Sequence, residues 1–243
     1  MDNSYIDFPD VRTMPDNLDL VAFSAADLNG NIITSTDPNS KVRMTIWGST
    51  YDPEVLLSAY ERGLFPMPLE VDGNPTAIGW WSPARRAIFY PDQIRITRSL
   101  KQSLKKYRVT FDTAFEQVMR SCGDPSRPQG WITEDVIEAY VHMHQLGHAH
   151  SVEVWDRKDK LVGGLYGVES GGVFAGESMF HTSRDASKVA LVHLANRLND
   201  GRGRIIDTQW MTDHLKSLGA QEMSRSDYVD LIATKQDVPS AFR

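Results

Sequence analysis

The first candidate for chemistry is a carboxylate in an apolar setting. Glu177 lies in GVFAGESMF, where the surrounding phenylalanines and methionine predict a buried strand. A half-buried carboxylate is costly unless it meets a cation or hydrogen-bond donors. The preceding strand, LVGGLYG, contains Gly163 and Gly164, and glycine inside a strand usually marks close approach by a ligand or another backbone. These strands therefore predict the wall of a site, although an internal salt bridge of Glu177, for instance with Lys188, is the structural alternative.

A second candidate is the acid–amide pair in IIDTQ. Asp207 and Gln209 are two residues apart, so on a strand their side chains would share one face. An isolated pair of this kind more often caps the following helix through side chain–backbone hydrogen bonds. A polar pair within a site and a cap at the end of a strand are both compatible with the residues alone.

Positive charge is concentrated between residues 85 and 108. Eight basic residues stand there against Asp92 alone, which gives that segment a charge of +7 and the rest of the chain −13, for a net charge of −6. Because clustered Lys and Arg neutralise phosphates, the segment predicts a polyanion-binding surface; a solvated helix face is the alternative. Trp80 and Trp81, just before it, predict either core packing or flat surfaces for a nucleobase. The basic residues are Arg85, Arg86, Arg95, Arg98, Lys101, Lys105, Lys106 and Arg108.

The remaining composition is that of an ordinary soluble protein. A single cysteine, Cys122, excludes an intramolecular disulfide and fits a reducing cytoplasm. The acidic N-terminal stretch lacks the apolar core of a signal peptide, and no run approaches the roughly 18 apolar residues of a membrane span. Of His142, His144, His148 and His150, the first two do not share a helix face and no cysteine lies near them in the sequence, so we predict no metal site.

The elements that must position these residues fall into two expected domains. Residues 1–84 predict a small α/β domain with short strands at Leu20–Phe23 and Val42–Trp47. Its clearest element is a helix that Asp52 can cap, with Pro53 in its first turn and Gly63 after its end.

Residues 85–243 predict the catalytic domain. Helices are expected after Thr113, which forms a possible capping box with Glu116, after Thr133, over Ala186–Leu198, after Thr212 and from about Asp227. Strands are expected at 107–112, 149–155, 161–168, 173–180, 204–208 and 220–224. This order predicts an α+β fold with a mixed sheet and helices on its faces. It matches an acetyltransferase-like (GNAT) arrangement better than a doubly wound sheet.

That fold class normally binds acyl-coenzyme A through a glycine-containing loop that opens the helix after the third meander strand. Here the corresponding segment reads HTSRDASKVA and contains no glycine. Gly201 and Gly203 come after the helix, where they more plausibly end it. Coenzyme A is therefore disfavoured, and we expect another donor.

Several motifs occur in the order seen in leucyl/phenylalanyl-tRNA–protein transferases, which the sequence therefore resembles. They are WWSPARR, the Trp131-Ile132-Thr133 corner, HAHSVEVW, LVGGLYG, GESMF, ASKVAL, IIDTQ and HLKSLGA. Upstream, LLSAYERGLFPM resembles the N-terminal helix of that family. The resemblance covers about Tyr51 to Leu231; residues 1–50 fit poorly, and the loop at 29–45 looks like an insertion.

The resemblance implies an aminoacyltransferase that acts on aminoacyl-tRNA. It would move Leu or Phe, with Met as an open third donor, to the N-terminal Arg or Lys of acceptor proteins and so mark them for degradation. Aminolysis of the activated ester needs no cofactor or enzyme nucleophile; the protein must hold an uncharged amine against the carbonyl and stabilise the developing charge. The implied partners are the 3′ end and acceptor stem of aminoacyl-tRNA and the acceptor proteins, with no membrane, and we expect a cytoplasmic monomer.

Carried onto this sequence, the family pattern assigns acceptor-amine activation to Asp207 and Gln209. Asp207 would orient Gln209, and whether Gln209 is a base or only positions the amine stays open. Glu177, in the GES motif, would face a cation of the acceptor. The positions that would hold the donor and the terminal adenosine are Met67, Trp80, Trp81, Trp131, Leu165, Ser187, Leu194 and Leu198. Leu194 and Leu198 lie four apart on one predicted helix, where the sequence alone makes them simply core.

The phosphates of the tRNA acceptor stem would lie on the basic segment, with recognition through the backbone rather than through bases. The residues expected there are Arg85, Arg86, Arg98, Lys101, Lys105 and Lys106. Two other functions stay open. One is another aminoacyl-tRNA-dependent transferase, such as one that extends a cell-wall peptide, against which the GESMF and IIDTQ context argues. The other is a non-catalytic tRNA-binding module.

Overall fold

The computed structural model describes residues 8, 10–16, 18–26, 32–35, 44–46, 51–71, 74–126 and 131–242. They form two compact units: one made of 1–86 and 223–234, the other of 87–222 and 235–243. The expected boundary after residue 84 lies beside the structural one. Segment 223–234, expected in the catalytic domain, belongs instead to the first unit. Among the described residues, no helix is long and apolar enough to cross a bilayer.

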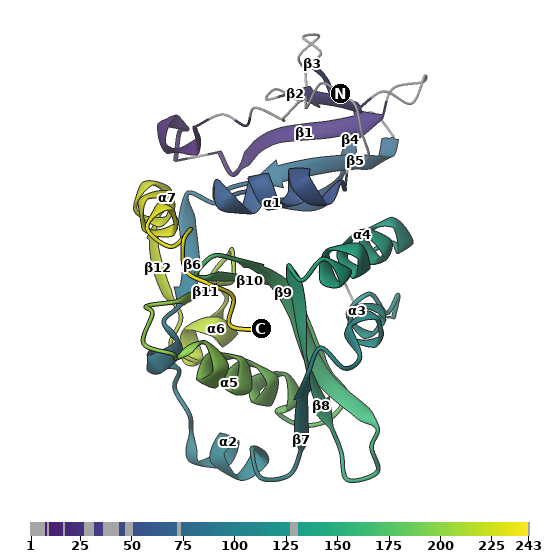
Figure 1. Ribbon diagram of the computed structural model, residues 1–243, viewed down its shortest axis with the longest axis vertical. Coiled ribbons are helices and arrows are strands. Elements are labelled where there is room, and N and C mark those ends of the chain that lie inside the picture. The colour runs from purple at the N-terminus through teal and green to yellow at the C-terminus, as the bar shows by residue number, and fades with distance from the viewer. Residues whose placement is uncertain are drawn as a thin grey trace. The chain divides into compact units, whose positions relative to one another are not determined.

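The first unit contains a five-stranded antiparallel sheet in the order β3-β2-β1-β5-β4. Its strands are β1 (Leu20–Ala26), β2 (Ile32–Ser35), β3 (Met44–Ile46), β4 (Phe65–Val71) and β5 (Asn74–Trp81). Two of them, β1 and β3, correspond to the expected short strands, and β2 lies inside the expected insertion. The helix α1 (Pro53–Glu61) lies along the β4–β5 hairpin (Figure 1).

The predicted ends of α1 are confirmed. The Asp52 carboxylate accepts a hydrogen bond from the Glu54 N–H at 2.9 Å, which satisfies one of the free N–H groups of the first turn. Gly63 has a φ of +79°, a left-handed conformation that glycine adopts without steric cost. The helix α7 (Arg225–Ala233) belongs to the same unit, and its Tyr228 ring packs on Gly63.

The second unit contains most of a seven-stranded mixed sheet in the order β12-β6-β11-β10-β9-β8-β7. The strands are β6 (Arg85–Phe89), β7 (Arg108–Phe111), β8 (Ala149–Trp155), β9 (Leu161–Ser170), β10 (Val173–His181), β11 (Ile205–Asp207) and β12 (Gln221–Ser224). The helices are α2 (Arg98–Ser103), α3 (Phe115–Cys122), α4 (Glu134–Gln145), α5 (Ala186–Leu198) and α6 (Asp213–Ser217). Strands β10 and β11 run parallel, while β6–β11, β10–β9, β9–β8 and β8–β7 are antiparallel. The expected mixed sheet is thus confirmed.

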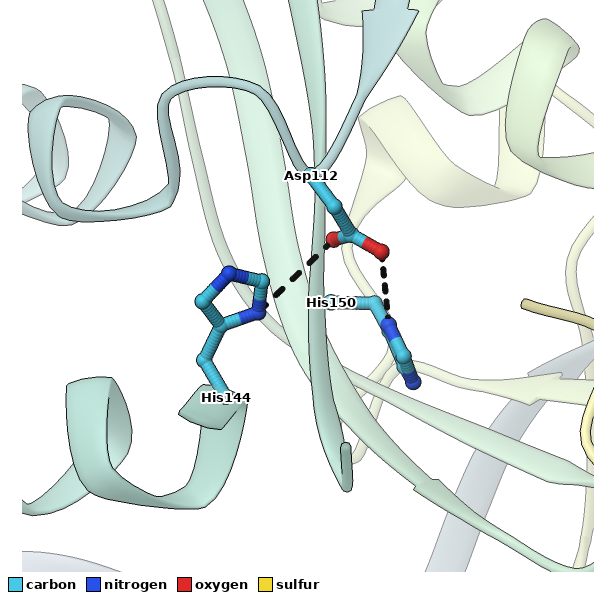
Figure 2. A group of neighbouring side chains, drawn as sticks. All are labelled: Asp112, His144 and His150. Atoms are coloured by element: carbon cyan, nitrogen blue, oxygen red, sulfur yellow. Dashed lines mark hydrogen bonds and ion pairs between the residues drawn. The ribbon is translucent and has the colours of Figure 1, made fainter. Parts of the chain in front are cut away.

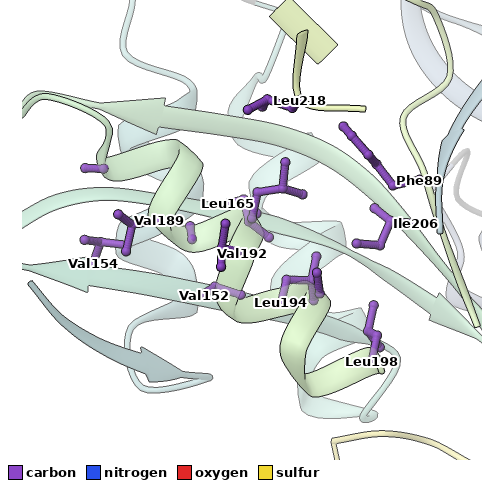
Figure 3. Close-up of a cluster of buried hydrophobic side chains, with 14 of the residues drawn as sticks. Phe89, Val152, Val154, Leu165, Val189, Val192, Leu194, Leu198, Ile206 and Leu218 are labelled. Atoms are coloured by element: carbon purple, nitrogen blue, oxygen red, sulfur yellow. The ribbon is translucent and has the colours of Figure 1, made fainter. Parts of the chain in front are cut away.

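The two faces of this sheet are covered by different helices. Leu165 of β9 belongs to a buried cluster built around α5, shown in Figure 3. The next residue, Tyr166, points to the opposite face, because side chains alternate along a strand. There its ring makes edge contacts with Phe115 of α3 and Tyr140 of α4, at centroid distances of 6.0 and 5.7 Å. The helix α5 therefore covers one face, and α3 and α4 cover the other.

The paired glycines of β9 bring backbones close together. A Cβ on Gly163 would lie 2.5 Å from the Cβ of Ala186, the first residue of α5. A Cβ on Gly164 would lie 2.7 Å from the Val152 carbonyl oxygen. Of the two uses expected for strand glycines, approach by another part of the chain accounts for both positions.

Candidate active site

The acid–amide pair lies at the end of β11 and is joined through the backbone. The buried Asp207 carboxylate accepts a hydrogen bond from the Gln209 N–H, with Oδ1 and N 2.9 Å apart. Gln209 has a φ of +59°, a left-handed conformation that is uncommon for a residue with a Cβ. The strand has therefore ended before Gln209. The expectation that both side chains extend from one strand face is wrong; Asp207 fixes the turn that carries Gln209.

Hydrogen bonds to the backbone of Ala87 in β6 hold the strained turn in place. The Gln209 carbonyl accepts a hydrogen bond from the Ala87 N–H at 2.9 Å, and the Thr208 N–H donates to the Ala87 carbonyl at 2.9 Å. The Thr208 hydroxyl donates to the same carbonyl at 3.1 Å. A left-handed non-glycine residue persists when its surroundings over-determine it, as these bonds do for Gln209.

The side-chain amide of Gln209 is the part of this turn that is available for chemistry. Gln209 is 8% exposed, and its Nε2 has no hydrogen-bond partner among the described residues. A buried donor without a partner costs free energy and so indicates a group beyond the residues that the structure describes. An amide offers one acceptor and two donors, which suits it to positioning an amine or a carbonyl.

Glu177 lies at an irregularity of the neighbouring strand. Gly176 pairs with Gly167 of β9, whereas Ser178 pairs with Tyr166, so Glu177 is an extra residue in β10. Such β-bulges redirect a side chain and are common next to active sites. Asp207 pairs in parallel with Ala175, two residues before Glu177. Glu177 therefore lies at the bulge of β10, and Asp207 and Gln209 lie at the end of the neighbouring strand β11 and in the turn after it.

The polar turn before α5 is organised by Asp185. Its carboxylate pairs with Lys188, the residue suggested as a partner of Glu177, at 3.2 Å. Partial burial acts to raise the pKa of Asp185, but hydrogen bonds from Ser103 and Lys188 outweigh it, and the net pKa is lowered. Ser187 is buried in the first turn of α5, with its Oγ 3.3 Å from Nδ1 of His181.

The apolar positions expected for the donor are brought together behind β11. Leu165, Leu194 and Leu198 belong to the buried cluster around α5, in which Figure 3 labels all three. Ile206 belongs to the same cluster, and by strand alternation Asp207, the next residue, points to the opposite face. The three leucines form part of the core, as the sequence alone suggested, and the cluster reaches the strand that carries the acid.

The other expected substrate residues include three in the first unit. Trp80 is fully buried and makes an edge contact with Phe8 at 5.0 Å, so its ring packs in that core instead of facing a nucleobase. Trp81 is partly exposed, and Met67 of β4 is partly buried. Trp131 is partly buried in the second unit.

The basic segment divides into an exposed and a buried part. The side chains of Arg85, Arg98, Lys101, Lys105 and Lys106 are exposed, and none of these five forms an ion pair within the described part of the chain.

Arg86 corrects the expectation for this segment. It is 1% exposed, and its guanidinium donates to the Gly63 carbonyl at 3.1 Å. The group also lies over the Phe65 and Tyr228 rings, 4.9 and 4.5 Å from their centroids. Arg86 therefore stabilises the first unit and is withdrawn from phosphate contact.

Two of the four histidines meet at a carboxylate that the sequence did not single out. Asp112 Oδ2 lies 2.8 Å from His150 Nδ1, and Oδ1 lies 3.9 Å from His144 Nδ1 (Figure 2). One ligand atom from each residue lies within 4.8 Å of the others, close enough to surround an ion. His144 Nδ1 is also 2.8 Å from the Ala149 carbonyl, so hydrogen bonds already account for both Nδ1 atoms.

A cavity of about 1050 Å³ lies beside this group, lined by Asp112, His144 and residues of α3 and α4. None of the residues predicted for catalysis, donor binding or tRNA binding lines it.

Comparison with known proteins gives one consistent family. The model for "Leucyl/phenylalanyl-tRNA protein transferase" matches residues 88–233, more than half of the chain, and the model of its N-terminal domain matches 49–84. A leucyl/phenylalanyl-tRNA–protein transferase of Afipia carboxidovorans is 47% identical over 198 residues, 80% of this chain and 86% of that protein. One from Azoarcus sp. is 48% identical over 197 residues, 79% of this chain and 80% of that protein.

Solved structures give weaker likenesses. L-PGS from Bacillus licheniformis aligns with a TM-score of 0.38 at 8% identity, over 65% of each chain. A functionally unknown conserved protein from Staphylococcus epidermidis aligns with a TM-score of 0.40 at 9% identity, over 76% of this chain and 66% of that one. At these scores the alignments carry no argument about fold or function.

Proposed function

Because this chain belongs to the leucyl/phenylalanyl-tRNA–protein transferase family and is an enzyme of that activity, we propose that its acceptors are proteins with an N-terminal Arg or Lys. Leucine and phenylalanine are the donors that the family name gives, and methionine is a third. The new N-terminal residue marks the acceptor for degradation. The observation that carries the proposal is the family match over residues 88–233, which includes Glu177, Asp207 and Gln209.

The reaction is aminolysis of an ester. The neutral α-amine of the acceptor attacks the carbonyl carbon, the bond to the 3′-oxygen of the terminal adenosine breaks, and a proton moves from the amine to that oxygen. The ester supplies the driving force, so the enzyme acts by alignment and by stabilising charge as it develops.

The turn at the end of β11 supports a positioning role for Gln209. Its buried amide lacks a partner in the described chain, and Asp207 fixes the backbone from which that amide extends. An amide is a poor base, so Gln209 orients the attacking amine through hydrogen bonds. Glu177, set apart by the β10 bulge, binds the positive charge of the acceptor residue.

The donor side chain enters an apolar pocket formed by residues of the α5 cluster. Leu165, Leu194 and Leu198 supply branched, exclusively apolar walls, which fit leucine and phenylalanine without a polar group left unpaired. A hydrophobic pocket separates side chains that differ by one methylene by only about 1–3 kcal/mol, which supports overlapping donors. By the family pattern, Trp131 and Ser187, which like the three leucines belong to the second unit, also serve the donor.

The α2 region binds the acceptor stem. Arg98, Lys101, Lys105 and Lys106 are exposed cations close together in the chain, and Arg85 extends the set. Recognition through phosphates suits an enzyme that accepts several tRNAs. We infer further that the second unit is an acetyltransferase-like domain that works as a monomer. Its use of a tRNA substrate supports a cytoplasmic reaction.

The double variant Lys101→Glu/Lys105→Glu is expected to weaken tRNA binding and flatten its salt dependence. Removing the cation from one phosphate lowers the slope of log K against log salt by about 0.7–0.9. Binding of labelled tRNA across a salt series measures this. The matched control is Lys158→Glu/Lys160→Glu, which makes the same charge change at two exposed residues of the β8–β9 turn. An unchanged slope in the first variant would remove the α2 region from the tRNA site.

The proposed function is tested by a transfer assay with labelled Leu-, Phe- and Met-tRNA in parallel. The acceptors are peptides that begin with Arg, Lys or Ala and are otherwise identical. Label is expected on the Arg and Lys peptides and not on the Ala peptide. Equal labelling of all three, or labelling of none, would overturn the acceptor assignment.

A further inference from the structure

The C-terminal segment Pro239–Phe242 is held on the second unit by buried charges. The Arg204 guanidinium donates to the Pro239 carbonyl at 2.5 Å and pairs with Glu169 at 3.3 Å. The Glu169 carboxylate in turn accepts a hydrogen bond from the Ala241 N–H at 2.8 Å. Arg204 and Glu169 are both buried, and a charge inside a protein is retained only where it is paired and hydrogen-bonded. These interactions therefore fix the backbone of the segment on the second unit.

The side chain of Phe242 packs among aromatic rings of the second unit. Its ring stacks on His150 with centroids 3.9 Å apart and an interplanar angle of 8°. The Phe174 ring of β10 lies 5.8 Å away. The Arg197 guanidinium lies 4.7 Å from the Phe242 centroid and 4.6 Å from that of Phe111. Arg197 is thus in cation–π contact with two rings, whose faces attract its positive charge.

These interactions connect the segment to α5. Arg197 Nε also donates to the Ala241 carbonyl at 3.0 Å, so one side chain of α5 holds both the backbone and the ring of the segment. Leu198 is the next residue of the helix, and Leu194 lies one turn earlier. Ala241 and Phe242 pack against the buried cluster that contains these two leucines.

We propose that Phe242 is a positioning residue that sets the choice of donor amino acid. By holding Arg197, it fixes the C-terminal turn of α5 and with it the depth of the pocket that Leu194 and Leu198 line. The inference rests on the proposed donor pocket. It adds to that pocket a support from Ala241 and Phe242, which lie outside the family motifs in the sequence.

The test compares donors under competition. In Phe242→Ala the last turn of α5 can move outward, which favours a larger side chain over a smaller one. The ratio of kcat/KM for Phe-tRNA to that for Leu-tRNA is expected to rise about fivefold, less than the roughly 10–200-fold that one methylene in direct contact with the substrate is worth. Phe242→Tyr keeps the ring and should keep the wild-type ratio. Asp237→Ala, an exposed side chain of the same segment, serves as the matched control.

Two further variants separate the outcomes. Arg197→Lys keeps the charge but loses the planar group that binds Ala241 and stacks on the rings, and it should shift the ratio in the same direction even if Phe242→Ala does not fold. Leu198→Ala tests the pocket itself. If Leu198→Ala shifts the ratio while Phe242→Ala and Arg197→Lys only lower both rates equally, the segment is merely structural and the inference fails. If Leu198→Ala also leaves the ratio unchanged, the donor pocket is wrong and the inference falls with it.

Discussion

Asp207→Ala is expected to lower kcat/KM for transfer by about 100-fold or more, while binding of uncharged tRNA is retained. A misplacement of reacting groups by about 1 Å can cost about 10²-fold in rate. Here the alanine removes the acceptor for the Gln209 N–H and releases a left-handed turn that is otherwise unfavourable. The Gln209 amide then loses its fixed direction. Single-turnover transfer from Leu-tRNA, alongside a tRNA-binding titration, measures both quantities.

Asp207→Asn is the matched control, because its side-chain oxygen can still accept the Gln209 N–H while the negative charge is removed. Activity of the asparagine variant well above that of alanine would indicate that holding the turn matters more than charge. Equal inactivity of the two would assign the role to the carboxylate charge. Wild-type rates in Asp207→Ala would contradict the proposed site, and loss of tRNA binding together with a lowered Tm would reduce Asp207 to a structural residue.

Gly167→Ala should destabilise the second unit by about 3 kcal/mol or more, the upper range for forcing extra volume into a packed interior. The added Cβ would lie 2.2 Å from the Ala175 carbonyl oxygen and 2.5 Å from the Phe174 ring. The carbonyl belongs to a central strand with neighbours on both sides, so it cannot move away without breaking the ladder. Denaturant unfolding followed by a probe in the second unit measures the decrease in stability.

Gly147→Ala provides the contrast, since a Cβ there would meet nothing within 4 Å. Its cost is the left-handed backbone alone, with a φ of +82° and a penalty of about 1 kcal/mol. If both variants were destabilised equally, close packing of β9 on β10 would not explain why position 167 is glycine.

Local patterns predicted most of the second unit well. Strand β8 and helix α5 have the predicted limits, because their apolar periodicity and flanking turn residues carry the whole signal. Thr212 caps α6 through its hydroxyl, as expected. The capping box at Thr113 is wrong: the hydroxyl donates to Glu153 on β8, and α3 begins after Ala114. A distant carboxylate competes for that hydroxyl, and its proximity cannot be seen in a local motif.

Contacts between residues that are distant in sequence, together with turns that lack their usual residues, also explain the errors at the candidate sites. A charge count treats all arginines alike, but Arg86 is buried by Tyr228, a residue distant in sequence. Strand alternation does not extend to Gln209, two residues beyond the end of β11. The sequence does not signal this left-handed turn, which is ordinarily marked by Gly or Asn. Asp112 also has a positive φ, of 57°, and an acid just after a strand is the signal that could have found it.

The first unit is discontinuous along the chain, and this affects how the protein can fold during synthesis. Its central arginine, Arg86, is translated early, but the Tyr228 ring that covers it is translated late. A ribosome must therefore deliver nearly the whole second unit before the first can close, even though domains generally fold as units with the N-terminal one first. Until α7 emerges, a nascent chain carries a guanidinium with one aromatic partner missing, so the first unit cannot be completed before residues 87–222 of the second have been made.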